Sequence, residues 1–497
     1  MNVHIGSRPS LLRNVRISGP SARFIPVSGP LDVLLDAGRI VDIAPAGALR
    51  PVGPIWDAEG RWAIPGLWDH HVHVNPWALF AVRENVHDAT SAHEVAVRMA
   101  AVPPDHRGVR VGVGMRDGLW QSPPVLTELD AITGDVPTYV VGADLHCVLV
   151  NSAAARREGI TAPADGMLRE APAFRVHASL DAISDDELDA AVSAAAARAA
   201  RQGIVGVVDF DMAWNIGAWQ RRGAAGFDTW RVRAGVYPQH LDRAIAEGWV
   251  SGDLLHDSGL LEVGSVKVIT DGSLGTRTAA CSVAYPSGGH GELTVQPEAL
   301  VGLLTRATGA GFSVAVHAIG DVANARALDA FAMSGAHGSL EHAQLVGRTD
   351  LPRFARLDVT ASVQPQHAVD DRELVRAEWA SQLAAAYPLR SLVDADANIT
   401  LGSDAPVAPL DPWGAIATAV GRSRAGEAEP QDGEGIDAIT ALGASTERGS
   451  RAAAELLPGS LADIAFCDAD PFASDVEGLR TMTVGATMLG GRFTHLS

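Results

Sequence analysis

Residues 263–272 read VGSVKVITDG, and this stretch contains Lys267, the single lysine of the 497-residue chain. Val263, Val266 and Val268 favour β-strands and glycines bound the run, so the stretch is predicted to form a strand. A neutral amine there can act as a nucleophile, whereas an arginine guanidinium stays protonated. Lysine also protects the edges of sheets, and from this stretch alone that interpretation stays open.

Eight apolar runs, of which this is the fourth, alternate with helical segments through the middle of the chain. Several helices have recognisable ends: Ser184 opens a capping box, Pro297 lies at a first helical position, and Asp321 can cap a third helix. The runs are Leu67–Val74, Gly203–Asp209, Trp230–Tyr237, Val263–Ile269, Phe312–His317, Ser339–His342, Val359–Gln364 and Ile399–Asp404. This alternation predicts an α/β protein with a (β/α)8 TIM barrel, whose chemistry collects at the carboxyl ends of the strands.

The two ends of the chain have a different pattern. Residues 11–65 and 459–497 contain short strands separated by glycine and proline, without a helical period. They predict one small β domain assembled from both termini. The predicted boundaries are 1–62 with 455–497 for this β domain, 63–454 for the barrel, and about 75–180 for an insertion after the first barrel strand.

Composition narrows the function. A net charge of −20 argues against nucleic acid and anionic membrane surfaces as partners. The three cysteines are far apart, so no disulfide framework is expected. The first residues lack the apolar core of a signal peptide, and no later run is long enough to cross a bilayer. We therefore expect a cytoplasmic protein.

Histidines and a carboxylate end several of the predicted strands. In residues 69–73, DHHVH, strand alternation places Asp69, His71 and His73 on one face and His70 on the other. Two imidazoles spaced in this way can chelate one metal ion. Later strands end at His317, His342 and Asp404. Each residue alone is more often a buried polar group, but their order along the chain favours one shared site.

These motifs resemble the amidohydrolase superfamily and, within it, the branch called amidohydrolase family 3. The resemblance covers nearly the whole chain. The matching segments are PGLWDHHVH at 65–73, VKVITDGSLGTR at 266–277, VHAIGD at 316–321, EHAQL at 341–345, SVQPQH at 362–367, GSDAPV at 402–407 and GSLADIAFCDADPF at 459–472.

The resemblance implies a (β/α)8 TIM barrel with a small composite β-sandwich domain from both termini, and a metal site within the barrel. His71 and His73 would hold a first ion with Asp404, and His317 and His342 would hold a second. Lys267 would bridge the two ions as an N-carboxylated lysine, which an arginine could not become. The expected cofactor is a divalent metal, taken as two Zn²⁺, although such ligands also suit iron, manganese or nickel.

The resemblance also implies catalytic and substrate-binding residues. Asp404 would move a proton between water and the leaving nitrogen, and Lys267 would act through its carbamate. His146, Arg277 and His367 are candidates to contact the substrate. Their alternatives are a core hydrogen-bonding residue, a surface residue and a loop residue, respectively. Glu170 resembles a recurrent position of this branch, without a role that the sequence defines.

Members of this branch include enzymes that deformylate N-substituted formamides. The expected reaction is therefore hydrolysis of the C–N bond of an amide-type small molecule, an N-acyl or N-formyl amine. A cyclic-amide hydrolase or a deaminase on the same barrel is an alternative, although a lysine bridge argues against a deaminase. A barrel that has lost catalysis and serves as an assembly subunit is a further alternative. Homodimerisation is also left open.

Overall fold

A computed structural model of the 497-residue chain underlies the description of the fold. The structure describes residues 4–24, 29–117, 120–143, 147–169, 171–181, 183–428, 430, 433–452 and 454–497. The chain divides into two compact units: one comprises Met1–His73 with Ala196–Ser497, and the other comprises Val74–Ala195.

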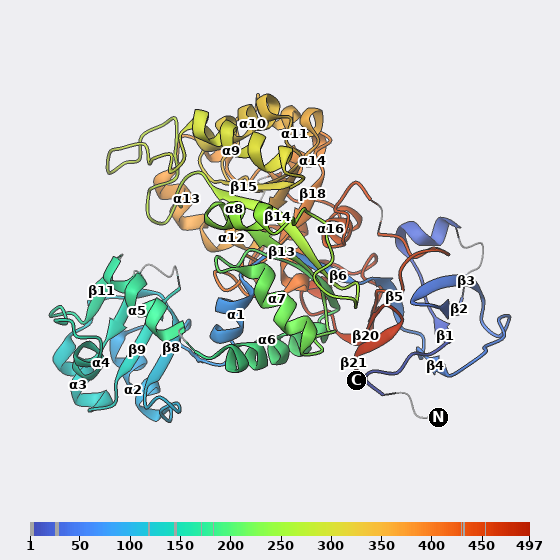
Figure 1. Ribbon diagram of the computed structural model, residues 1–497, viewed down its shortest axis with the longest axis horizontal. Coiled ribbons are helices and arrows are strands. Elements are labelled where there is room, and N and C mark those ends of the chain that lie inside the picture. Colours follow the sequence, from blue (N-terminus) through green and yellow to red (C-terminus); the bar gives the residue numbers. More distant parts are fainter. Residues whose placement is uncertain are drawn as a thin grey trace. The chain divides into compact units, whose positions relative to one another are not determined.

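The larger unit contains a parallel barrel of eight strands, which confirms the predicted fold class (Figure 1). The order in the sheet is β18-β17-β16-β15-β14-β13-β12-β6, so neighbouring strands follow one another along the chain. β6 is the first strand of the sheet and β18 is the last. The strands are β6 (Leu67–Val72), β12 (Ile204–Asp209), β13 (Arg231–Val236), β14 (Leu261–Ile269), β15 (Val314–Ala318), β16 (Gly338–His342), β17 (Val359–Val363) and β18 (Ile399–Leu401).

The barrel closes between its first and last strands. Asp404 donates its backbone N–H to the carbonyl of His71 at 2.7 Å, and His73 donates to the carbonyl of Ala405 at 2.9 Å. Gly402 makes this approach feasible, since a Cβ atom there would lie 2.6 Å from the backbone nitrogen of His71. Gly402 and the residues after it leave the strand, so β18 is shorter than the predicted Ile399–Asp404.

Helices follow most barrel strands and cover the outside of the sheet (Figure 1). The predicted start of α9 at Pro297 is confirmed. Asp321 is the first residue of α10 rather than its cap, and Gly320 occupies the cap position. The Asp321 carboxylate instead accepts a hydrogen bond from the backbone of Ser282 at 2.8 Å. The helices of this unit are α7 (Asn215–Ala224), α8 (Pro238–Ala246), α9 (Pro297–Gly309), α10 (Asp321–Ser334), α11 (Leu351–Leu357), α12 (Pro365–Asp370), α13 (Arg372–Glu378), α14 (Leu389–Asp394), α15 (Pro412–Gly421), α16 (Ala438–Ala444) and α17 (Val476–Arg480).

Both chain ends form the predicted composite β-sandwich. One sheet has the order β3-β2-β1-β4 and the other the order β21-β20-β19-β5. Trp56 packs edge-on against Phe466 and Phe493, so side chains from both ends of the sequence share one apolar core. The predicted domain boundaries stay predictions. The strands are β1 (Leu11–Val15), β2 (Leu31–Asp36), β3 (Arg39–Pro45), β4 (Ile55–Asp57), β5 (Trp62–Pro65), β19 (Ile464–Cys467), β20 (Val484–Leu489) and β21 (Arg492–Leu496).

The second unit contains a five-stranded sheet with the order β11-β10-β9-β8-β7. The predicted capping box is present, because Ser184 accepts from the backbone of Glu187 and the Glu187 carboxylate accepts from the backbone of Ser184. Within the described stretches, none of the helices has the length and apolar composition needed to span a bilayer. The elements are α1 (Val74–Phe80), β7 (Glu84–Asn85), α2 (Ala92–Ala101), β8 (Arg110–Met115), α3 (Leu126–Thr133), β9 (Thr138–Gly142), β10 (Cys147–Val150), α4 (Ser152–Arg157), β11 (Met167–Arg169), α5 (Ala171–Asp181) and α6 (Asp185–Ala200).

Candidate metal centre

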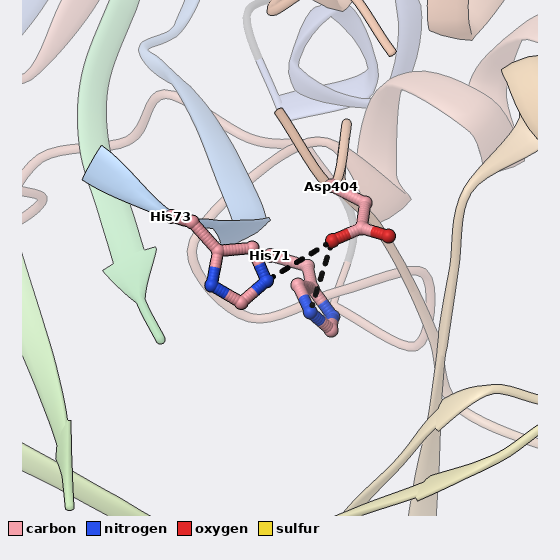
Figure 2. A group of neighbouring side chains, drawn as sticks. All are labelled: His71, His73 and Asp404. Carbon is pink, nitrogen blue, oxygen red and sulfur yellow. Dashed lines mark ion pairs between the residues drawn. The ribbon is translucent and has the colours of Figure 1, made fainter. Parts of the chain in front are cut away.

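Three side chains from the first and last barrel strands converge on one point. Oδ1 of Asp404 lies 3.5 Å from Nε2 of His71 and 3.3 Å from Nε2 of His73. Figure 2 shows both imidazoles directed at the same carboxylate oxygen. The neighbouring His70 is directed elsewhere, since its Nε2 lies 2.8 Å from the carbonyl oxygen of Thr446. Strand alternation in β6 therefore separates His70 from this group.

A second group shares the same carboxylate. His342, His367 and Asp404 each offer one potential ligand atom, and these three atoms lie within 4.8 Å of one another. Nε2 of His367 is 3.9 Å from Oδ2 of Asp404 and is buried without a hydrogen-bond partner among the described residues. His317 packs edge-on against His342, with ring centroids 4.5 Å apart, but its Nε2 faces Asp271 at 3.5 Å. The sequence indicated His367 only as a candidate to contact the substrate, whereas the structure places its imidazole beside the Asp404 carboxylate.

Lys267 lies within the barrel beside these imidazoles. Its side chain is buried, with Nζ 3.3 Å from Nε2 of His71 and 4.4 Å from the centre of the Phe210 ring. Burial lowers the pKa of Lys267 to about 8, against the opposing charges of Glu341 and Asp404. An edge-protecting lysine would be exposed to solvent. The position of Lys267 therefore contradicts the edge-strand interpretation.

Burial sets the charge states of the group. Desolvation, with the charge of Lys267, lowers the pKa of His71 far below its usual value and lowers the pKa of His317 to about 4. Burial also opposes ionisation of Asp404, but the neighbouring imidazoles outweigh it and hold the pKa of this carboxyl well below its usual range. At His73, the hydrogen bond to Asp404 outweighs burial and raises the pKa. His71 and His317 are therefore held in the neutral form beside an ionised Asp404.

Two buried polar residues that the sequence did not single out hold these imidazoles. Oε2 of Glu341 accepts a hydrogen bond from Nδ1 of His71 at 2.7 Å. Oε1 of Gln364 lies 2.8 Å from Nδ1 of His342. A glutamate within a barrel strand, next to His342, was the available signal for Glu341, since such a carboxylate is buried only when it is paired.

Of the remaining predicted site residues, only Arg277 lies in the described part of the chain, and it does not join the group. Arg277 is about half exposed and forms an ion pair with Glu378 at 2.8 Å. His146 and Glu170 lie outside the described residues. Their predicted contacts with a substrate stay predictions.

The donor atoms fit a divalent metal ion. His71, His73 and Asp404 each offer one ligand atom, and these atoms lie within 4.8 Å of one another. Imidazole nitrogen and carboxylate oxygen are the donors that zinc and similar ions take in proteins. Because Nδ1 of His71 donates to Glu341, Nε2 of His71 is the atom that can donate an electron pair to a metal ion beside Asp404.

A family model described as the amidohydrolase family matches residues 55–495 of the chain. The chain belongs to the amidohydrolase family. This match includes every barrel strand. Of the β-sandwich strands, β1, β2 and β3 lie before the matched residues. The resemblance inferred from the motifs is therefore confirmed.

Individual relatives align over most of their length. The chain is 28% identical to Protein LONG AFTER FAR-RED 3 of Arabidopsis thaliana, over 92% of this chain and 86% of the relative. It is 25% identical to N-substituted formamide deformylase of Arthrobacter pascens, over 92% of this chain and 94% of the relative. An uncharacterized metal-dependent hydrolase from Pyrococcus horikoshii has the same fold, with a TM-score of 0.79 and 24% identity, over 94% of this chain and 99% of that one.

Proposed function

We propose that this amidohydrolase is a metal-dependent hydrolase that cleaves the C–N bond of an amide-type small molecule, an N-acyl or N-formyl amine. The observation that carries the proposal is the convergence of His71, His73 and Asp404 at the carboxyl end of the barrel strands. The similarity to an N-substituted formamide deformylase supports the substrate class.

His71, His73 and Asp404 would hold one divalent ion, and His317 and His342 would hold a second. We propose that these ions are two Zn²⁺ and that Lys267 would help to hold them. A bound divalent ion lowers the pKa of water and polarises a carbonyl oxygen. Lys267 would act as a carbamate, which forms when the neutral amine adds carbon dioxide and releases a proton, and its two oxygens would supply negatively charged ligands to the metal site. The lowered pKa of Lys267 favours the neutral amine that this addition needs.

Asp404 is placed to move the proton. Its low pKa keeps the carboxylate ionised at neutral pH, so it can accept a proton from the attacking water. The water oxygen bonds to the carbonyl carbon, the C–N bond breaks, and Asp404 returns the proton to the leaving nitrogen. The products are a carboxylic acid and an amine. Nε2 of His367 is buried beside Asp404 and is suited to hydrogen-bond the substrate oxygen as negative charge develops there.

A small substrate panel tests the proposal. Protein stripped of metal and reconstituted with Zn²⁺ is assayed with 4-nitroformanilide and 4-nitroacetanilide, and release of 4-nitroaniline is followed by absorbance. We expect turnover that depends on the added metal. Activity confined to cyclic amides, or to release of ammonia from an aminopyrimidine, would replace this substrate class by one of the alternatives. Metal binding without turnover of any compound would favour the non-catalytic barrel.

A further inference from the structure

A carboxylate lies directly behind the proposed metal-binding imidazole of His71. Glu341 is on β16 and its side chain is 1% exposed. Its Oε2 accepts from Nδ1 of His71 at 2.7 Å, and the hydroxyl of Ser339 donates to its other oxygen. Both carboxylate oxygens are therefore held, which fixes the orientation of the group that faces the imidazole.

His342 has a matching arrangement. Oε1 of Gln364, the residue before α12, lies 2.8 Å from Nδ1 of His342. The amide nitrogen of Gln364 lies 3.5 Å from Nδ1 of His71, so one carboxamide contacts both imidazoles. With both Nδ1 atoms engaged by acceptors, each ring carries its proton there, and Nε2 of each ring is the electron-pair donor.

Packing alone does not account for a charge at position 341. Burial raises the pKa of Glu341, which reflects the cost of a carboxylate in this place. The residue also lines a cavity of about 440 Å³ in the amino-terminal half of the barrel, with polar neighbours that include Ser265, Ser313 and Thr360. Barrel interiors are usually filled by branched apolar residues at this level. The chain instead keeps a polar interior behind His71.

We propose that Glu341 and Gln364 are positioning residues that fix the tautomers of His71 and His342 and so present Nε2 of both rings to a divalent metal. The inference rests on the proposed function, because it concerns the same site. A carboxylate that accepts from Nδ1 also makes Nε2 a stronger electron-pair donor, and partners of this kind change metal affinity by about 10- to 100-fold. Glu341 therefore acts on the metal through His71, without touching the substrate.

Metal affinity of the stripped protein is the test, measured by competition between the protein and a chromogenic chelator for Zn²⁺ or Co²⁺. Glu341→Gln keeps an oxygen acceptor but loses the charge, and Glu341→Ala loses both. We expect affinity about 10-fold weaker in Glu341→Gln and about 100-fold weaker in Glu341→Ala. Gln364→Met keeps the side-chain length without the acceptor and should weaken binding by about 10-fold. The absorption spectrum of the Co²⁺ forms reports any change in the ligands.

Asp32→Asn is the matched control. Asp32 is a fully buried carboxylate on β2 of the β-sandwich, where it accepts from the backbone of Gly47 at 2.8 Å. This variant should lose stability and keep wild-type metal affinity. Thermal unfolding identifies variants that do not fold, and Glu341→Gln preserves volume if Glu341→Ala fails.

The outcomes separate the two claims. Equal affinity in wild type, Glu341→Gln and Gln364→Met would overturn the inference and leave the proposed hydrolase standing. The inference would also be overturned if the Glu341 variants lost no more metal affinity than Asp32→Asn. A wild-type protein that binds no divalent metal would overturn the proposed function, and the inference with it.

Discussion

Asp404 and His71 are in contact through both backbone and side chain at the seam of the barrel, where its first strand lies beside its last. The backbone N–H of Asp404 donates to the carbonyl of His71 at 2.7 Å, and Oδ1 of Asp404 lies 3.5 Å from Nε2 of His71. The backbone pairing that closes the barrel thus also sets the distance between two proposed metal ligands. Asp404 has φ 58°, a left-handed conformation that costs energy in a residue with a Cβ atom. The seam holds this strained residue where its carboxylate reaches both His71 and His73.

Asp404→Asn should separate catalysis from metal binding. The amide keeps an oxygen donor toward the imidazoles, but it cannot accept a proton from water. We expect most of the metal content to remain, while kcat falls by about 10²–10⁴-fold. Elemental analysis and steady-state rates on the same preparation check this. A variant with wild-type kcat would show that another group carries the proton.

Lys267→Arg should abolish the proposed bridge. Arginine keeps the positive charge and approximate length but cannot add carbon dioxide. We expect loss of about one equivalent of metal and nearly all turnover. Because the chain has one lysine, ¹³C-bicarbonate should give one side-chain carbamate signal by NMR in the wild type and none in the variant. Normal metal content and turnover in Lys267→Arg would favour a centre without the carbamate.

His70→Gln should make the protein less sensitive to acid. Burial lowers the pKa of His70 to about 4, whereas an unfolded histidine has a pKa near 6.5. The unfolded chain therefore binds a proton first as pH falls, and this group costs the wild type stability between about pH 6.5 and 4, by about 3 kcal/mol in full. Glutamine does not titrate, and its amide can still donate a hydrogen bond to the carbonyl of Thr446 in place of His70. Denaturant unfolding of both proteins from pH 4 to 8 checks this, and a difference that stays constant with pH would contradict it.

Gly402→Ala should strain the barrel seam. Its Cβ atom would lie 2.6 Å from the backbone nitrogen of His71, so the strands must move apart, at a cost of about 1–3 kcal/mol. We also expect weaker metal binding, because the displacement moves His71 relative to Asp404. Gly302→Ala in α9 is the control: its Cβ atom would meet nothing within 4 Å, and the helix should gain about 0.5–1 kcal/mol. Chemical denaturation and metal titration of both variants measure the two effects.

Much of the fold is predictable from local patterns. The apolar run 263–269 lies within β14, and the run at 359–364 corresponds to β17 with one residue fewer. Strand ends are less predictable, as at β18, because Gly402 and the residues after it follow the geometry of the seam rather than the apolar pattern. Asp321 was misassigned as a cap for a similar reason: its carboxylate accepts from Ser282, a residue distant in the sequence.

The sequence by itself determined the order of strands and helices and the face of β6 that carries His71, because periodicity along one strand is a local property. It also indicated which residue types carry the chemistry, including the single lysine. Only the tertiary structure decided which side chains meet: Glu341 with His71, Gln364 with His342, and His367 beside Asp404. These contacts join different strands, so they depend on the register between strands and on closure of the barrel, which no local pattern encodes.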